Sequence, residues 1–420
     1  MKTRININST GPQNLSIRAQ FFLAYAFAAI PYSFYFKGRQ IVYVLLFIII
    51  AYMAHSRRSS YPISFKLYLL LVVELIIFQS ITFFRFSLTN FYGVLINILY
   101  AFFLISLLHK NTYKYYTSIV LIITIISFIF YFPSLISTTI HSLIGKIPHY
   151  LKTDYLLKDQ NFIIYTWERY STLGLLRNSG NYTEPGSFSA YLNLALIFNI
   201  IHKKQILNKI NILLIIAIIT TFSTAGYISL FIIIMGFTIS QKKVTYQIIA
   251  APIIIFVSIY SFQHLPFLQE KINKQLYAVE YKGLNTGRFG SAVNDLKDFK
   301  KYPLRGRGLL KVTRFDEIRG WNGDQSPRSL SNGLTNQVVR YGVLGFIIYI
   351  LLMFRSLRMY LREFDINQYY VFYIIAAIFA AAFSQSVLEN APFLGLLFIG
   401  DFVSRKKKAN NENIYYHSQL

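Results

Sequence analysis

Long apolar runs, separated by short basic connectors, occupy most of this chain of 420 residues. Several runs approach the ~18 apolar residues that mark a transmembrane helix. Charged residues make up 14% of the chain, whereas a soluble globular domain contains roughly 25%. The sequence therefore predicts an all-α polytopic membrane protein, with residues 1–420 forming a single transmembrane domain of about twelve helices. The candidate spans are residues 19–36, 41–54, 65–83, 91–108, 117–136, 185–201, 210–222, 225–240, 244–262, 335–354, 369–383 and 391–403.

The distribution of Lys and Arg among the connectors predicts the orientation of the chain. Connectors on the side of the N-terminus contain most of the basic residues, whereas the short connectors on the other side contain only Lys37, Arg39 and Arg85. Because short cytoplasmic loops carry the excess of Lys and Arg, we expect both termini in the cytoplasm. The two long loops, residues 137–184 and 263–334, then both lie outside the membrane.

Residues 210–240 are compatible with one span or with two. A single tilted helix would place the loop 263–334 in the cytoplasm instead. The small polar break Ser223-Thr224-Ala225-Gly226 favours two short spans, because clusters of such residues are typical of turns.

The loop 263–334 is the most polar and basic part of the chain, with 13 Lys and Arg against seven Asp and Glu. A loop of this length is more often functional than a simple connector. Within it, residues 288–299 repeat apolar side chains such as Phe289, Ala292 and Leu296 at helical spacing, opposite Asp295 and Asp298. This pattern predicts an amphipathic helix that lies along the outer membrane surface.

Six arginines on the predicted outer side are candidates for binding phosphate. Guanidinium groups bind phosphate oxygens in pairs and keep their charge. Arg340 differs from the others because it lies about one and a half turns inside its span, beside Asn336 and Gln337, where an ionisable residue should face a polar cavity. The alternative is a solvated loop whose basic residues meet anionic lipid head groups. The six are Arg177, Arg288, Arg305, Arg307, Arg319 and Arg340.

Three further positions allow both a structural and a functional interpretation. Glu184 precedes Pro185 and can cap the start of a helix, or it can act as a base or accept a sugar hydroxyl at the membrane boundary. Ser331 and Asn332 can cap the next span or contact substrate. Glu74 lies alone in the middle of its span, so it needs a structural partner or a role in catalysis.

Several chemistries have no motif in this chain. It contains no Cys, no Asp-x-Asp sequence, no glycine-rich phosphate loop and no His-Glu-x-x-His sequence. We therefore expect no metal site, no cofactor and no nucleic-acid partner.

A set of short motifs occurs in a characteristic order between Arg177 and Gly345. On these motifs and its pattern of spans, the chain resembles bacterial O-antigen polymerases of the Wzy type, within the O-antigen ligase/polymerase superfamily. The motifs are Arg-Asn-Ser-Gly-Asn-Tyr-Thr-Glu-Pro-Gly-Ser at 177–187, Ser-Thr-Ala-Gly at 223–226, Thr-Gly-Arg at 286–288, Tyr-Pro-Leu-Arg-Gly-Arg-Gly at 302–308, Ser-Asn-Gly at 331–333 and Arg-Tyr-Gly-Val-Leu-Gly at 340–345.

The resemblance implies a C-type membrane glycosyltransferase in the bacterial plasma (inner) membrane. Such an enzyme polymerises undecaprenyl-pyrophosphate-linked oligosaccharide repeats on the outer face, for lipopolysaccharide O-antigen or for capsule, alongside a flippase and a chain-length regulator. By analogy, Arg288 and a partner, Arg177 or Arg340, would hold the pyrophosphate and Glu184 would take part in catalysis. Substrate contacts would come from Arg305, Arg307, Arg319, Ser331, Asn332 and Gln337.

Two other functions are compatible with the same pattern. Ligases of this superfamily typically have a His in the region of Ser331, and its absence here argues against a ligase and leaves the general base unassigned. A lipid-linked oligosaccharide flippase has a similar number of spans and a basic cavity. Transporters tend to be built from related halves with short connectors, whereas here two long external loops contain most of the unusual residues.

Overall fold

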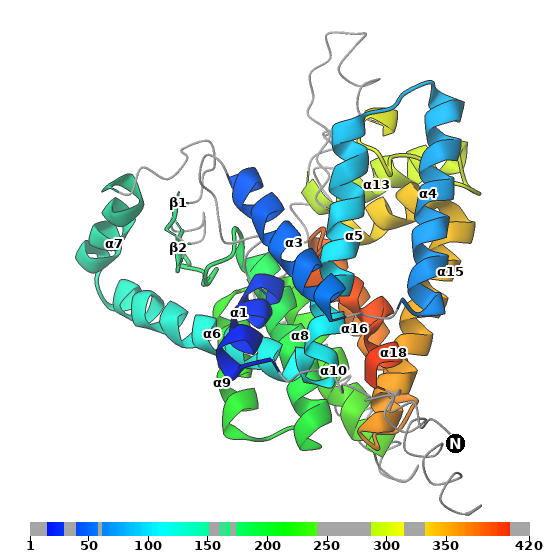
Figure 1. Ribbon diagram of the computed structural model, residues 1–420. Helices are drawn as coiled ribbons and strands as arrows, with labels where there is room; N and C mark the ends of the chain where they lie inside the picture. Colours follow the sequence, from blue (N-terminus) through cyan, green and yellow to red (C-terminus); the bar gives the residue numbers. More distant parts are fainter. Residues whose placement is uncertain are drawn as a thin grey trace, which may run out of the picture.

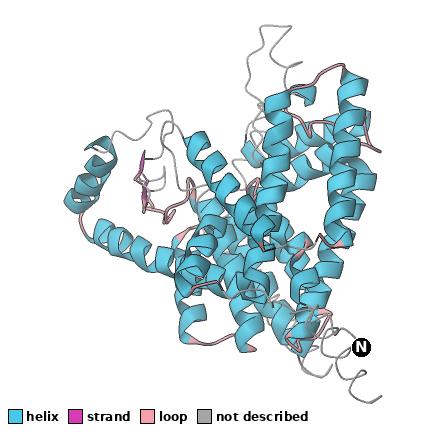
Figure 2. Cartoon of the chain, viewed as in Figure 1, coloured by secondary structure: helices cyan, strands magenta, loops and turns pink. Residues whose placement is uncertain are grey.

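The computed structural model describes residues 15–28, 39–57, 61–150, 160–162, 164–168, 174–241, 287–314 and 332–403. These residues are almost entirely helical (Figures 1 and 2). The first part of the chain forms α1 (Ile17–Ala28), α3 (Arg39–Ser56), α4 (Ile63–Phe83), α5 (Leu88–Leu108), the 3-10 turn η1 (His109–Asn111), α6 (Thr112–Ile136) and α7 (Thr138–Tyr150). The second part forms α8 (Pro185–Lys203), α9 (Lys209–Thr220), α10 (Thr224–Gln241), α13 (Gly287–Lys301), α15 (Gly333–Glu363), α16 (Tyr370–Ser384), α17 (Ala391–Leu394), η2 (Gly395–Leu397) and α18 (Ile399–Val403).

Four stretches of helix in the described residues are long and apolar enough to cross a membrane. They are Ile63–Phe83, Leu88–Ile136, Thr224–Gln241 and Gly333–Glu363, with mean hydropathy between 1.5 and 2.6. Shorter apolar helices accompany them at Ile17–Ala28, Ile41–Ser56, Lys209–Thr220 and Tyr370–Ser384. The expectation of an all-α protein with several membrane-spanning helices is confirmed at this level. The total of twelve spans stays a prediction, and the candidate span 244–262 lies outside the described residues.

Helix α8 is the centre of the bundle. Every residue from Pro185 to Ile201 is buried, and α6, α9, α10 and α16 all contact this helix. Buried tyrosines donate their hydroxyls to backbone carbonyls around it: Tyr116 to Tyr191 at 3.0 Å and Tyr113 to Pro392 at 2.8 Å. Each ring fills apolar space while its polar tip stays hydrogen-bonded, as a low-dielectric interior requires.

Helix α15 is broken at Gly342, whose φ of 64° and ψ of −179° interrupt the helical ladder. The segment 303–309 packs into the break: the amide of Arg307 donates to the carbonyl of Val339 at 2.7 Å, and that of Val343 donates to Pro303 at 2.8 Å. A Cβ at Gly342 would lie 2.4 Å from the carbonyl oxygen of Leu304, so only glycine fits this crossing.

Gln79 of α4 supplies three further hydrogen bonds at the break. Its side-chain amide donates to the carbonyls of Arg305 at 3.0 Å and Arg340 at 2.9 Å, and its oxygen accepts from the amide of Leu309 at 3.0 Å. Non-helical backbone at membrane depth is tolerated where its polar groups are satisfied by protein in this way.

The structure bears on three further expectations about individual elements. The candidate span 391–403 is not one helix, because α17, η2 and α18 divide it into short pieces, and Asp401 near its end is buried against Arg355. The described residues of the loop 137–184 include α7 and an antiparallel pair of strands, Gln160–Asn161 and Thr166–Trp167. Residues 210–240 form two helices, α9 and α10, which agrees with the interpretation of two short elements.

Helix α13 forms where the amphipathic pattern predicts it, but its polar face points inward. Asn294, Asp295 and Asp298 are buried, whereas Leu296 is 50% exposed. The polar face is covered by Arg314 and by the start of α15. The apolar pattern therefore located the helix correctly, and buried ion pairs decide which face is turned to the protein.

Candidate active site

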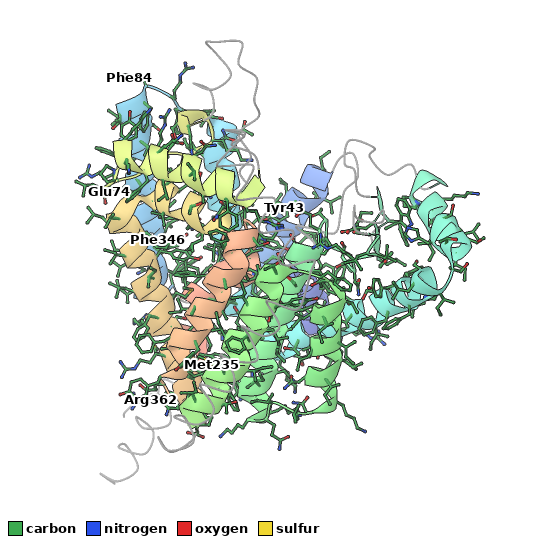
Figure 3. The ribbon with its side chains drawn as sticks, turned by 180° about the vertical axis from the view of Figure 1, so that it is seen from behind. Tyr43, Glu74, Phe84, Met235, Phe346 and Arg362 are labelled. Carbon is green, nitrogen blue, oxygen red and sulfur yellow. The ribbon has the colours of Figure 1, made fainter. Side chains whose placement is uncertain are left out.

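The candidate site lies at one end of the bundle, where α8 and α15 begin and α16 ends. The connection from Gln385 to Asn390 runs between the two helix starts. A Cβ added at Gly186 would lie 2.6 Å from the side-chain nitrogen of Gln385, and one at Gly333 would lie 2.2 Å from the Gln385 carbonyl oxygen. Gly333 is thus required for this close approach of two backbones, whereas at Gly186 the contact is with the movable end of the Gln385 side chain. In Figure 3, Phe84 after α4 and Arg362 near the end of α15 lie at opposite ends of the molecule.

Glu184 stands immediately before α8 and has the extended backbone of an N-cap residue, yet its side chain makes no capping hydrogen bond. Its carboxylate instead accepts a hydrogen bond from the side-chain amide of Gln385 at 2.7 Å and lies 3.8 Å from a terminal nitrogen of Arg288. The side chain is 52% exposed. The side chain of Glu184 therefore does not cap α8, and its role in binding or catalysis stays a prediction.

Arg288, in the first turn of α13, faces this carboxylate. Its Nε donates to the carbonyl of Ser384 at 2.8 Å, and within the described residues its two terminal nitrogens make no hydrogen bond. Burial lowers the pKa of Arg288, the neighbouring Glu184 raises it, and nearby Arg177 lowers it again. The guanidinium stays charged and keeps two nitrogens available for an anion.

Arg177 approaches from the segment before α8. Its Nε donates to the carbonyl of Thr221, at 3.1 Å, and so supports the end of α9. The following residue, Asn178, donates its amide to the carbonyl of Thr220 at 3.0 Å. The first two residues of the 177–187 motif therefore support the turn between α9 and α10. Arg177 is also close enough to Arg288 to affect its pKa.

Arg340 is buried in the first part of α15 and forms an ion pair with Glu389. One terminal nitrogen also donates to the carbonyl of Leu309 at 3.4 Å. Its Nε, both polar atoms of the Gln337 side chain and the side-chain nitrogen of Asn332 are buried without a hydrogen-bond partner in the described part of the chain. Unpaired buried polar groups are costly, so this concentration points to a polar interior around Arg340, as its depth in the span predicts. Asn332 itself caps α15, accepting from the amide of Thr335 at 3.0 Å.

A second group of charged residues packs against the polar face of α13. Arg314 is buried and uses all three guanidinium nitrogens: it donates to Asp295 at 2.5 Å, to Asp298 at 2.9 Å and to the Asn336 side chain at 2.9 Å. Burial raises the pKa of Asp295, while Arg314 and a hydrogen bond from Thr335 lower it. This cluster ties α13 to α15 and thereby places Arg288 beside Glu184.

The other candidates lie elsewhere or outside the described residues. Arg305 is exposed and lies over the Phe78 ring, 4.2 Å from its centroid, and buried Arg307 lies 4.8 Å from the centroid of Phe83, with its Nε donating to Thr313 at 2.8 Å. Both arginines therefore pack on the end of α4. Glu74 is exposed on α4 and is not brought to the site (Figure 3). Arg319 and Ser331 lie outside the described residues.

Sequence reasoning missed three residues of this region. Glu389 was recognisable as a carboxylate in the short connector between two apolar runs on the predicted outer side, and Gln385 lies in the same connector. Arg314 was counted only as one basic residue of a polar loop. Its burial depends on Asp295 and Asp298, which a helical projection places together but does not pair with a distant arginine.

Comparisons of the chain with protein-family models, with curated proteins and with solved structures find no match. Among the described residues, no group of three His, Asp or Glu side chains is placed to hold a metal ion.

Proposed function

We propose that this protein is a membrane glycosyltransferase that polymerises lipid-pyrophosphate-linked oligosaccharide repeats on the outer face of a bacterial plasma membrane. One observation carries the proposal: within the described residues the two terminal guanidinium nitrogens of Arg288 make no hydrogen bond, and one of them lies 3.8 Å from the Glu184 carboxylate. Buried Arg340, near the start of α15, adds a second positive charge. Fixed positive charge beside a half-exposed carboxylate is what departure of a pyrophosphate and deprotonation of a sugar hydroxyl require.

In the proposed reaction, a hydroxyl of one lipid-linked repeat attacks the anomeric carbon of the growing chain. The new glycosidic C–O bond forms as the bond from that carbon to the pyrophosphate oxygen breaks. Glu184 accepts the hydroxyl proton, and the electron pair of the broken bond leaves with the lipid pyrophosphate. Arg288 and Arg340 stabilise the charge that accumulates on the leaving pyrophosphate.

The supporting residues have positioning roles in this scheme. Gln385 holds the Glu184 carboxylate at 2.7 Å, so the carboxylate is oriented without being buried. The Arg314 cluster fixes the position of α13. The hydrogen bonds of Gln79 fix the break in α15 at Gly342. Arg305, Arg307, Arg319 and Ser331 are assigned no role in the chemical step.

The orientation and partners belong to the same proposal. Both termini lie in the cytoplasm, the acceptor and donor are undecaprenyl-pyrophosphate-linked oligosaccharides, and a flippase and a chain-length regulator act beside the enzyme. The product is a surface polysaccharide, either O-antigen or capsule.

Deletion of the gene tests the proposal against its main alternative. Loss of a polymerase leaves single repeat units on the cell surface, which migrate as one short species in an electrophoretic ladder. Loss of a flippase leaves no repeat on the surface, because the units stay on the inner leaflet. Single repeats that disappear from the surface on deletion would contradict the polymerase assignment and support the flippase.

A further inference from the structure

A cavity of about 450 Å³ lies at the end of the bundle opposite to Glu184. It forms where α8 ends and where α6 and α9 begin. Helix α8 contains 19 residues, so at 1.5 Å per residue roughly 28 Å separate its two ends. The cavity and the candidate active site are therefore on opposite sides of a layer about as thick as a membrane interior.

The lining of this cavity is basic and includes no acidic residue. Three of its lining side chains are Lys110, Lys114 and Lys203, and within the described residues none of them forms an ion pair with a carboxylate. The nearby Asp365 is engaged by Lys204 instead, at 3.8 Å. Three ammonium groups around one cavity, without a counter-charge from the protein, favour an anionic ligand.

Polar groups deeper in the lining are held in place by the protein. Asn199 is buried and donates to the side chains of Asn211 at 2.7 Å and Asn208 at 3.2 Å. His202 is hydrogen-bonded to the hydroxyl of Tyr360 at 2.7 Å. Asn111 stands at the start of α6, and its side chain makes no capping hydrogen bond.

Apolar side chains complete the lining. Leu121 of α6, Ile210 of α9 and Phe364 after α15 contribute to the same cavity. A free inorganic anion makes no favourable contact with such an apolar surface, whereas the glycerol and first methylenes of a phospholipid pack against it. Basic pockets between membrane helices are characteristic sites for phosphate-bearing lipid head groups.

We infer that this cavity binds the phosphate head group of an anionic membrane lipid, with Lys110, Lys114 and Lys203 as the ligands of the phosphate. The inference does not depend on the polymerase activity, because the cavity shares no residue with the candidate active site.

The test uses the full-length protein purified in detergent and native mass spectrometry. Wild-type protein is mixed with phosphatidylglycerol or with phosphatidylcholine of the same acyl chains, and the retained lipid is counted. The variant is Lys114→Gln with Lys203→Gln; the control is Lys66→Gln with Arg362→Gln, two exposed residues outside the lining. At about 1 kcal/mol per basic residue, we expect the variant to lose about 30-fold of its phosphatidylglycerol retention and the control to lose none.

Three outcomes would overturn the inference. The first is equal retention of the two lipids by the wild type, and the second is an equal loss in the variant and in the control. The third comes from an added arm with inorganic phosphate: if phosphate alone displaces phosphatidylglycerol from the wild type, the site takes the free anion and not the lipid. Retention of phosphatidylglycerol in the presence of millimolar phosphate, lost only in the cavity variant, is the supporting result.

Discussion

Two arginines beside α13 differ in how many partners they have: Arg288 in its first turn and Arg314, which follows the helix and pairs with two of its carboxylates. Arg314 is 3% exposed, and its three nitrogens are all bonded to Asp295, Asp298 and Asn336. Arg288 is 23% exposed, bonds a backbone carbonyl through Nε and has one carboxylate at 3.8 Å. An arginine whose donors are all used by the protein holds the fold, whereas one with donors left over is available to a ligand. Sequence alone presents both as basic residues of one loop.

We expect the largest effect on stability from removing Arg314 from its cluster with Asp295, Asp298 and Asn336. Arg314→Ala leaves two buried carboxylates without a counter-charge, and breaking a buried ion pair in this way costs about 3–5 kcal/mol. The amount of membrane-inserted protein should fall, and thermal unfolding in detergent should shift downward. Lys311→Ala, an exposed residue nearby, is the control and should be unaffected. A fully stable Arg314→Ala protein would show that the cluster does not hold α13.

Arg340 is intermediate between the two cases, since it has one carboxylate and a buried Nε without a partner. We expect Arg340→Ala to abolish polymer while the protein remains inserted, because a lost charge-assisted contact to the transition state costs about 2–4 kcal/mol. Polymer length per inserted molecule is the measurement. Normal polymer with reduced protein would instead place Arg340 with Arg314 among the structural residues.

Substitutions of Glu184 test whether its carboxylate is needed for polymerisation. Its carboxylate does not cap α8, so replacement by a better capping residue should not preserve function. We expect Glu184→Ser and Glu184→Gln to lose polymer by roughly 100-fold, the lower end of general-base catalysis, and Glu184→Asp to retain part of it. A wild-type ladder from Glu184→Ser would remove Glu184 from the reaction.

Hydropathy and spacing predicted the helices well because these depend on local sequence. The expected spans 65–83, 91–108 and 369–383 all coincide with helices within three residues at each end. The break at Gly342 and the division of 391–403 were not predictable in the same way. Both depend on distant partners, Gln79 for the first and Arg355 for Asp401 in the second.

Sequence reasoning singled out some of the residues that the structure brings together at the candidate site and overlooked others. Arg288, Arg340 and Glu184 lie at one end of the bundle, as the predicted external side requires. Glu389 and Gln385 were overlooked because no motif surrounds them, although their connector lies on the same predicted side. Whether the donors of an arginine are all used by the protein cannot be inferred from spacing. It depends on which carboxylates the fold brings within 3 Å of the guanidinium.

The smallest perturbation concerns orientation and should leave function intact. Because the chain contains no Cys, single Cys substitutions have no background. Cys in place of exposed Lys300 should react with a membrane-impermeant maleimide in spheroplasts, and Cys in place of exposed Lys209 should not. The reverse pattern would invert the proposed topology and place the arginines in the cytoplasm.

The most direct measurement compares Arg288→Lys with Arg314→Lys in one gene-deletion strain, scoring both inserted protein and polymer length. A lysine keeps the charge but cannot bind two oxygens in a planar pair. The account predicts that Arg288→Lys is inserted normally but loses about 100-fold of its polymerisation. It predicts that Arg314→Lys is less abundant but makes polymer of normal length per inserted molecule. A full ladder from Arg288→Lys, or the same loss of polymer per molecule from both variants, would contradict it.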